Sequence, residues 1–219
     1  MPTFPNAPRL FKGALALLDP DSGRLQRIIA LQFNPETLTR TLQVQSVQGE
    51  GGDRMEALRL TGPPVETIKL DAEIDATEQL EFPGENLTAA VSGIHPQLAA
   101  LETIVYPSSS RIQQNNSLAQ VGTLEIIPAQ SFLTLFVWSA SRILPVRLTE
   151  ISITEEMFDK SLNPIRAKVS LGMRVLTVND LNFSHRGNNL FMIHHQLKER
   201  LAQLNQAGAL SAAVTSTIR

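Results

Sequence analysis

The chain alternates between the two-residue hydrophobic period of β-strands and the longer period of amphipathic helices. The clearest alternation runs from Ile68 to Asp75, where apolar residues share one parity and charged residues the other. A longer alternation covers residues 165–175 and would span roughly 35 Å as a strand. These two segments predict a sheet with one buried face and one face exposed to water. Further strands are predicted at 13–18, 25–33, 37–45, 122–127 and 131–138.

Two stretches follow the helical period instead. The stripe within residues 85–105 is interrupted at Pro96, which predicts two helical pieces with Pro96 in the first turn of the second. The second stretch begins at Asn188 or Asn189, either of which could cap the helix. Its stripe, which we interpret as a docking helix, consists of Leu190, His194, Leu197, Leu201 and Leu204. The polar segments 46–62 and 108–120 are predicted to be loops.

These patterns give a domain organisation. We expect residues 1–181 to form one β-rich domain that is preceded by a loose arm at 1–10. Residues 182–219 are expected to form the docking helix and a flexible tail. The strand at 131–138 is apolar on both faces, which indicates that it is fully buried or covered by a partner subunit. A change of parity near Thr149-Glu150 indicates a β-bulge.

Composition narrows the class of protein. The chain has 219 residues, a hydrophobic fraction of 42%, a formal net charge of -2 and no cysteine. Without cysteine there is no disulfide, no thiolate metal site and no cysteine nucleophile. The charge argues against a nucleic-acid partner. No apolar run is long enough for a membrane segment, and the N-terminus does not resemble a signal peptide, so synthesis in the cytoplasm is expected.

No catalytic constellation is evident. The chain contains neither a phosphate-binding glycine loop nor a nucleophile elbow. His194 and His195 would point about 100° apart on a helix, which disfavours a shared metal. Glu155 and Glu156 would point to opposite faces of a strand, which disfavours a carboxylate pair. We therefore predict no catalytic, cofactor-binding or metal residues, and we expect a protein that is not an enzyme.

Two arginines occupy positions that need an explanation. Arg40 shares the parity of the apolar residues in its strand, and Arg142 lies beside the doubly apolar strand. An arginine on an apolar face needs an acidic partner or a subunit boundary, because an unpaired buried charge is costly. We hypothesise that one of them pairs with the acidic cluster Glu155, Glu156 and Asp159. The alternative is an ordinary surface arginine.

Two separated motifs carry a resemblance to a known family. The first is QFNPETLTR at 32–40, and the second is VWSASRILPVRLTEISITEEMFDKSLNPIRAKVSLGMRVL at 137–176. Over roughly residues 11–181 the chain resembles the amino-terminal domain of the contractile injection system tube protein family, which includes adaptors between the spike hub and the inner tube of phage-tail-like particles. The motif residues proposed to act in assembly are Phe33, Asn34, Pro35, Glu36, Arg40, Trp138, Arg142, Leu144, Pro145, Glu155, Glu156, Phe158, Asn163, Pro164 and Arg166.

The resemblance implies a mainly β, α+β fold: a tail-tube-like antiparallel β-sandwich or barrel with one central helix, followed by the C-terminal amphipathic helix. It implies a homohexameric ring that contacts a spike or hub protein and an inner tube protein, with sheath or baseplate components as further candidate partners. The ring would join the baseplate to the tube and initiate tube assembly within an assembled particle. Many family members carry a LysM module after this domain, whereas this chain has only the helix and tail.

Other functions stay open on the sequence alone. A major inner-tube subunit would share the motifs and differ in copy number. A small-ligand-binding β-barrel would need an apolar cavity with a few polar groups. An enzyme that uses carboxylate chemistry would need neither histidine nor cysteine.

Overall fold

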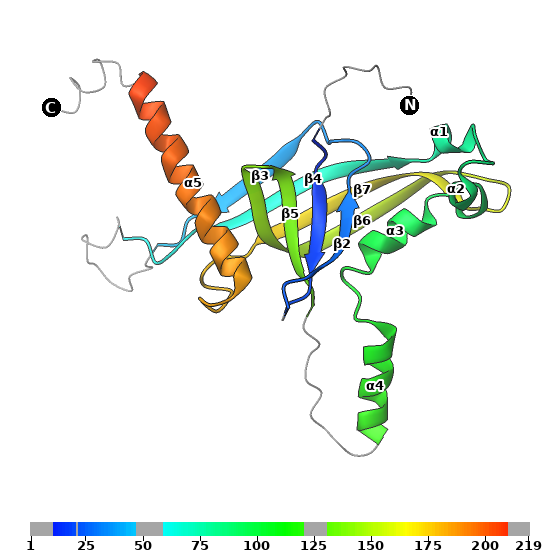
Figure 1. Ribbon diagram of the computed structural model, residues 1–219, viewed down its shortest axis with the longest axis horizontal. Helices are drawn as coiled ribbons and strands as arrows, with labels where there is room; N and C mark the ends of the chain where they lie inside the picture. Colours follow the sequence, from blue (N-terminus) through cyan, green and yellow to red (C-terminus); the bar gives the residue numbers. More distant parts are fainter. Residues whose placement is uncertain (1–10, 21, 47–58, 121–130, 210–219) are drawn as a thin grey trace.

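The computed structural model describes residues 11–20, 22–46, 59–120 and 131–209, with side chains up to 204. Seven antiparallel strands form one sheet in the order β2-β1-β5-β6-β7-β4-β3 (Figure 1). The strands are β1 (Ala14–Leu18), β2 (Leu25–Ala30), β3 (Leu38–Gln43), β4 (Val65–Asp75), β5 (Leu133–Ser139), β6 (Arg142–Phe158) and β7 (Pro164–Val175). The helices are α1 (Thr77–Leu80), α2 (Leu87–Ser92), α3 (His95–Glu102), α4 (Ser109–Gln120) and α5 (Arg186–Ala209).

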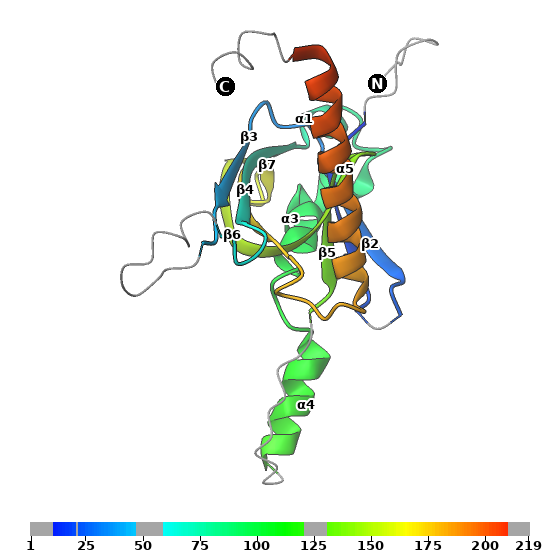
Figure 2. The same ribbon diagram turned by 90° about the vertical axis from the view of Figure 1, so that its left-hand side faces the viewer.

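The mainly β, α+β class predicted from the sequence is confirmed. The sheet is a single open layer that curls around α3 without closing into a barrel (Figure 2). The expected hairpin at 13–33 is β1 and β2, and the bulge lies between Leu148 and Glu150, as the change of parity predicted. Four short helices, rather than one central helix, connect β4 to β5.

The core lies on the concave side of the curled sheet. The even residues of β4 from Ile68 to Ile74 are buried, whereas Lys69 and Asp71 on the other parity are exposed. Leu98 and Leu101 of α3 join this core cluster. The predicted break of the helical stripe is confirmed, because α2 and α3 are separate and Pro96 lies in the first turn of α3, where its missing N–H costs nothing.

Strand β5 is covered on both faces within the same chain. Phe136 belongs to the core cluster, whereas Leu133 and Leu135 form a second cluster with β1 on the opposite face. Leu190 of α5 packs against that second cluster. The expectation of full burial is thus met only for Leu133 to Phe136, since Phe132 at the start of the predicted strand is 46% exposed. Helix α5 crosses one open end of the curled sheet (Figure 2).

The connection between β2 and β3 is fastened by two side-chain amides. Gln32 donates from Nε2 to the Asp75 carbonyl (2.6 Å) and accepts from the Asp75 N–H (2.9 Å). Asn34 accepts from the Gly13 N–H (2.9 Å) and donates to the Phe11 carbonyl (2.8 Å). Each amide thus supplies one donor and one acceptor to a strand end, as a neighbouring backbone would. The motif around Asn34 therefore ties β1 and β4 to the β2–β3 connection.

The structure corrects two of the local predictions. Residues 109–120 form a helix, not a loop, although none of the described side chains in α4 is buried. The Ser108 hydroxyl accepts from the Arg111 N–H (3.4 Å), which is the pattern of an N-cap. Helix α5 begins at Arg186, before the predicted caps, and the His185 ring accepts from the Gly187 N–H (3.1 Å).

Several expectations concern residues outside the described part of the chain. These are the loose arm at 1–10, most of the loop at 46–62, the strand at 122–127 and the tail after 209. The division into domains at residue 181 stays a prediction.

The amide of Gln32 should contribute measurably to stability. We expect Gln32→Ala to lower the free energy of unfolding by about 1–3 kcal/mol, because both polar backbone groups of Asp75 lose their partner. Chemical denaturation measures this change. Gln26→Ala, on the exposed surface of β2, is the matched control and should cost less than about 0.5 kcal/mol. Equal effects of the two substitutions would contradict the assigned role of Gln32.

Candidate functional site: the polar face and free edges of the sheet

The long strands β6, β7 and β4 present a continuous polar face. The pairing of these strands sets Lys168 between Thr154 of β6 and Glu73 of β4. The next row along the strands consists of Ser152, Ser170 and Asp71. Short hydroxyls and charges of both signs thus alternate across three strands, on the side opposite the core. Such a face stays hydrated, and it offers no apolar surface to which another molecule could bind.

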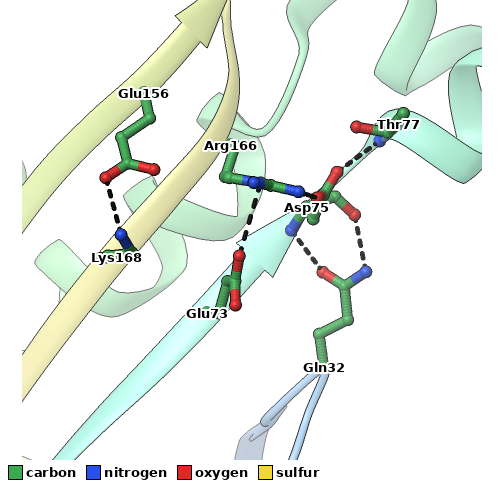
Figure 3. A network of polar contacts seen from close by, with 7 residues as sticks. All are labelled: Gln32, Glu73, Asp75, Thr77, Glu156, Arg166 and Lys168. Atoms are coloured by element: carbon green, nitrogen blue, oxygen red, sulfur yellow. Dashed lines mark hydrogen bonds and ion pairs between the residues drawn. The ribbon is translucent and has the colours of Figure 1, made fainter.

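An ion-pair network lies at the end of this face nearest α1 (Figure 3). Arg166 donates from Nε to Asp75 Oδ2 at 2.8 Å, and its Nε lies 3.4 Å from Glu73 Oε1. Lys168 pairs with Glu156 across 3.0 Å. Burial would raise the pKa of Asp75, but hydrogen bonds from Thr77 and Arg166 outweigh it and lower the pKa. The pKa of Arg166 is raised by the same Asp75 carboxylate.

Arg40 has a buried acidic partner, although not the one predicted. Its Nε and one terminal nitrogen each lie 2.6 Å from Oε1 of Glu66, a β4 residue whose side chain is only 4% exposed. Lys198 of α5 reaches the other oxygen of Glu66 at 3.2 Å. Burial would raise the pKa of Glu66, but Lys198 and Arg40 reverse the effect and lower the pKa. The triad Arg40–Glu66–Lys198 therefore fastens α5 to β3 and β4.

The predicted acidic cluster has other roles, so the pairing hypothesis for Arg40 is corrected. Glu156 binds Lys168, and Asp159 organises the β6–β7 turn. Glu155 is exposed in β6. Arg142 starts β6 at the other end of that long strand, so it lies far from this cluster. Parity could have identified Glu66, because it shares the buried parity of Ile68 and Leu70.

His194 lies beside this triad on α5. It is 8% exposed, and its Nδ1 is 3.3 Å from the carbonyl oxygen of Ser141. Its Nε2 is buried without a hydrogen-bond partner in the described residues. Burial first, and then the nearby Lys198 charge, lower the pKa of His194, so the ring is neutral at pH 7. The position of His194 on the predicted apolar stripe agrees with this burial.

The other motif residues fall into two groups. Leu144, Pro145 and Pro164 are buried, and Trp138 stacks on Phe136 with ring centroids 5.8 Å apart. These positions stabilise the fold. The exposed group, which is available to a partner, consists of Phe33, Glu36, Glu155 and Phe158, and Pro35 is partly buried. The resemblance to a family therefore rests on both packing residues and surface residues.

The docking helix is only partly covered. His194 is buried, and Leu190 and Leu197 are partly buried, so the first half of α5 packs on its own chain. Leu201 and Leu204 are exposed, because the helix continues beyond the sheet (Figure 1). The predicted stripe thus divides into an internal half and a free half.

Two strand edges are free among the described strands. β2 pairs only with β1, and β3 pairs only with β4. Between β2, α3 and β4 lies a mainly apolar groove of about 420 Å³. Unpaired edges of this kind can pair with another chain.

Neither a metal centre nor a membrane span is found in the described residues. No group of three or more histidines and carboxylates is placed to hold a metal ion there. No described helix is long and apolar enough to cross a membrane.

Comparison with known proteins identifies no family for this chain. No family profile matches the chain, and no curated protein matches it. Among solved structures, the chain is similar to one described as the tail of an empty GTA particle, obtained with helical refinement and C6 symmetry. The identity is 11%, the TM-score is 0.29, and the match covers 74% of this chain and 90% of the other. At that TM-score the likeness carries no argument about fold or function.

The buried triad should be sensitive to loss of its single carboxylate. We expect Glu66→Gln to lower the free energy of unfolding by about 1–3 kcal/mol, because Arg40 and Lys198 lose their charged partner but stay partly exposed to water. Glu199→Gln on the exposed face of α5 is the control and should change stability by less than about 0.5 kcal/mol. Chemical denaturation compares the two. A loss below 1 kcal/mol for Glu66→Gln would show that the triad is not stabilising.

Stability should depend on pH through His194. Because its pKa is lower in the folded chain, the unfolded chain takes up the proton first, and stability should fall as the pH drops below about 6.5. Thermal unfolding at pH 7.5, 6.5 and 5.5 measures the slope. His194→Gln should flatten the slope in this range, whereas Gln196→Ala on the exposed face of α5 should leave it unchanged. An unaltered slope in His194→Gln would assign the effect to other groups.

Proposed function

We propose that the chain is a structural subunit that forms a homo-oligomeric ring in a contractile injection system, a phage-tail-like particle. The observation that carries the proposal is one open antiparallel sheet with long strands, a polar face and a free edge on each side. The motif resemblance over 11–181 supports the same assignment. The sheet and the resemblance are independent, since the first concerns backbone pairing and the second concerns particular residues.

Ring closure would satisfy the sheet's edges. If β2 of one subunit lies against β3 of the next, each exposed edge gains backbone partners and the risk of uncontrolled edge pairing disappears. The polar face of β6, β7 and β4 would then line the inside of the ring. Its short hydroxyls and paired charges suit a water-filled lumen through which other molecules pass.

Within such a particle we favour the adaptor position between the spike hub and the inner tube, from which tube assembly would begin. The support is the resemblance to adaptors at QFNPE and LNPIRAKV. In this proposal the free half of α5 takes the place of the appended module as a contact to neighbouring proteins. The alternative is a major inner-tube subunit, which has the same ring but stacks in many copies. The proposed partners are other copies of this chain, the hub protein and the tube protein.

One observation favours a different class of function. The groove between β2, α3 and β4 has a volume of about 420 Å³, which is within the range of small-molecule sites. A ligand-binding protein would use this groove as a monomer. Saturable binding of an apolar dye by the monomer, competed by a small apolar ligand, would favour that function.

Electron microscopy of particles that carry an epitope tag on this chain tests the proposal. A single label near the spike end is expected for an adaptor, whereas label along the whole length would indicate a tube subunit. Ile28→Lys, on the exposed side of the β2 edge, should abolish incorporation because a lysine disfavours edge pairing. Ile112→Lys on α4 has similar exposure and should incorporate normally. Particles that form normally without the protein would refute the proposal.

A further inference from the structure

Large apolar side chains gather where the long strands end. The segment with α1 and α2 and the turn between β6 and β7 lie together at this end of the molecule (Figure 1). Six of their apolar residues are between 50% and 78% exposed, and we call them the tip patch: Phe82, Leu87, Val91, Met157, Phe158 and Leu162. Exposed apolar groups in such number mark an interaction surface rather than ordinary surface variation.

The tip patch is held rigidly. Asp159 accepts from the Asn163 N–H (2.8 Å) and from the Asn163 side-chain amide (2.8 Å), which closes the turn. The Asn163 amide also donates to the Val91 carbonyl (3.1 Å), which joins the turn to α2. Gly93 has a φ of +55°, and a Cβ there would lie 2.2 Å from the Pro164 carbonyl oxygen, so the turn and α2 are in direct backbone contact. The backbone of the turn is therefore fastened to α2 beneath the tip patch.

Backbone strain adds an independent sign of function. Met157 and Leu162 have φ angles of 55° and 62°, in the left-handed region that glycine and asparagine tolerate best. Leu162 is also 78% exposed, so its side chain contributes little to the core. Folding alone would favour glycine or asparagine at this position. A strained and exposed leucine is explained if a partner covers it.

The charge around the tip patch indicates what the partner carries. Residues 76–96 and 155–164 contain six carboxylates and one lysine, so this end of the molecule is acidic. Asp159 is used within the turn and Glu156 pairs with Lys168, so the acidic rim consists of the exposed Glu78, Glu81, Glu85 and Glu155. A partner surface must then combine apolar side chains with cationic groups.

The opposite end of the same chain has this combination. In the second half of α5, Leu201 and Leu204 are exposed, beside the exposed Arg200 and beside Lys198, which pairs with Glu66. Arg40 and Arg142 lie at the same end, on the sheet beneath the helix. Against these four cations stand the carboxylates of Glu66 and Glu199. The two ends lie far apart along the strand direction, so they cannot meet within one molecule (Figure 1).

We propose that the tip patch of one copy docks on the second half of α5 of the next copy, head to tail. The contact is heterologous, since it joins two different surfaces and leaves one of each free for further copies. This inference rests on the second of the two proposed positions, the inner-tube subunit that stacks in many copies, because a single adaptor ring would not repeat the contact. It uses neither β2 nor β3, so the edges remain available for ring closure.

The substitution Leu162→Asn should weaken this contact without destabilising the fold. Asparagine tolerates the left-handed backbone, so the melting temperature should stay level or rise by about 1–4 °C. Self-association, measured by sedimentation velocity of the full chain, should weaken roughly tenfold because a buried leucine is lost from the interface. Ile112→Asn on α4, with a similarly exposed apolar residue, should leave association unchanged. A Leu162→Asn protein that is more stable and equally associated would overturn the proposal.

Mixing two variants tests that the contact is head to tail. Glu85→Lys damages the acidic rim of the tip, and Leu201→Lys damages the apolar part of the second half of α5 without creating a partner for the lysine at position 85. Each variant alone should associate at least several-fold more weakly than the unmodified chain. A mixture should form dimers that do not grow, because each variant keeps one intact surface. Absence of such dimers, or a monomeric unmodified chain at the highest soluble concentration, would overturn the proposal.

The outcome in particles distinguishes this inference from the proposed function. If the tagged chain is present in particles and Glu85→Lys incorporates normally, the head-to-tail contact is wrong and the proposed function stands. If Glu85→Lys fails to incorporate while self-association in solution is unaffected, the tip patch binds a different protein, which also overturns the proposal. If the unmodified chain is absent from particles, the proposed function fails irrespective of self-association.

Discussion

An open sheet must satisfy the backbone groups at its ends and edges, and this requirement organises the rest of the molecule. The curl brings β2 and β4 toward each other around α3, but the two strands do not pair. Gln32 supplies the missing partner for Asp75 with a side-chain amide, and Asn34 does the same for the start of β1. Two amides thus hold a sheet that is nearly but not fully closed, and its outer edges remain free.

Helix α5 covers the other end of the same sheet. An amphipathic helix beside an open sheet normally relies on apolar contacts, and Leu190 provides one. Here a buried carboxylate, Glu66, also receives cations from two different elements. Such a charge is strongly position-specific, because any other placement of the helix would leave it unpaired. His194 adds a buried ring, and this burial lowers its pKa. The helix is therefore fixed in one position, and its second half is left in solvent.

The turn between β6 and β7 is exposed and strained, in contrast to the packed first half of α5. Its backbone is strained at Leu162, and its apolar residues face water, so it is poorly optimised for an isolated chain. Its hydrogen bonds nevertheless fix it firmly to α2. Rigid, strained and exposed features of this kind are typical of surfaces that act in an assembly. The molecule thus combines a well-packed interior with two ends at which apolar side chains are exposed to solvent.

The sequence determined what depends on local periodicity. Alternation located β4 and β7, the change of parity located the bulge after Leu148, and Pro96 located the break between helices. Parity also required an acidic partner for Arg40. Tertiary structure decided which carboxylate that was, because Glu66 and Lys198 lie far apart in the chain and meet only after the sheet has curled. It also decided that the sheet stays open and that α4 is helical, since neither depends on a hydrophobic pattern within one segment. Periodicity records which face of an element is buried, but only the packed chain establishes what lies against that face.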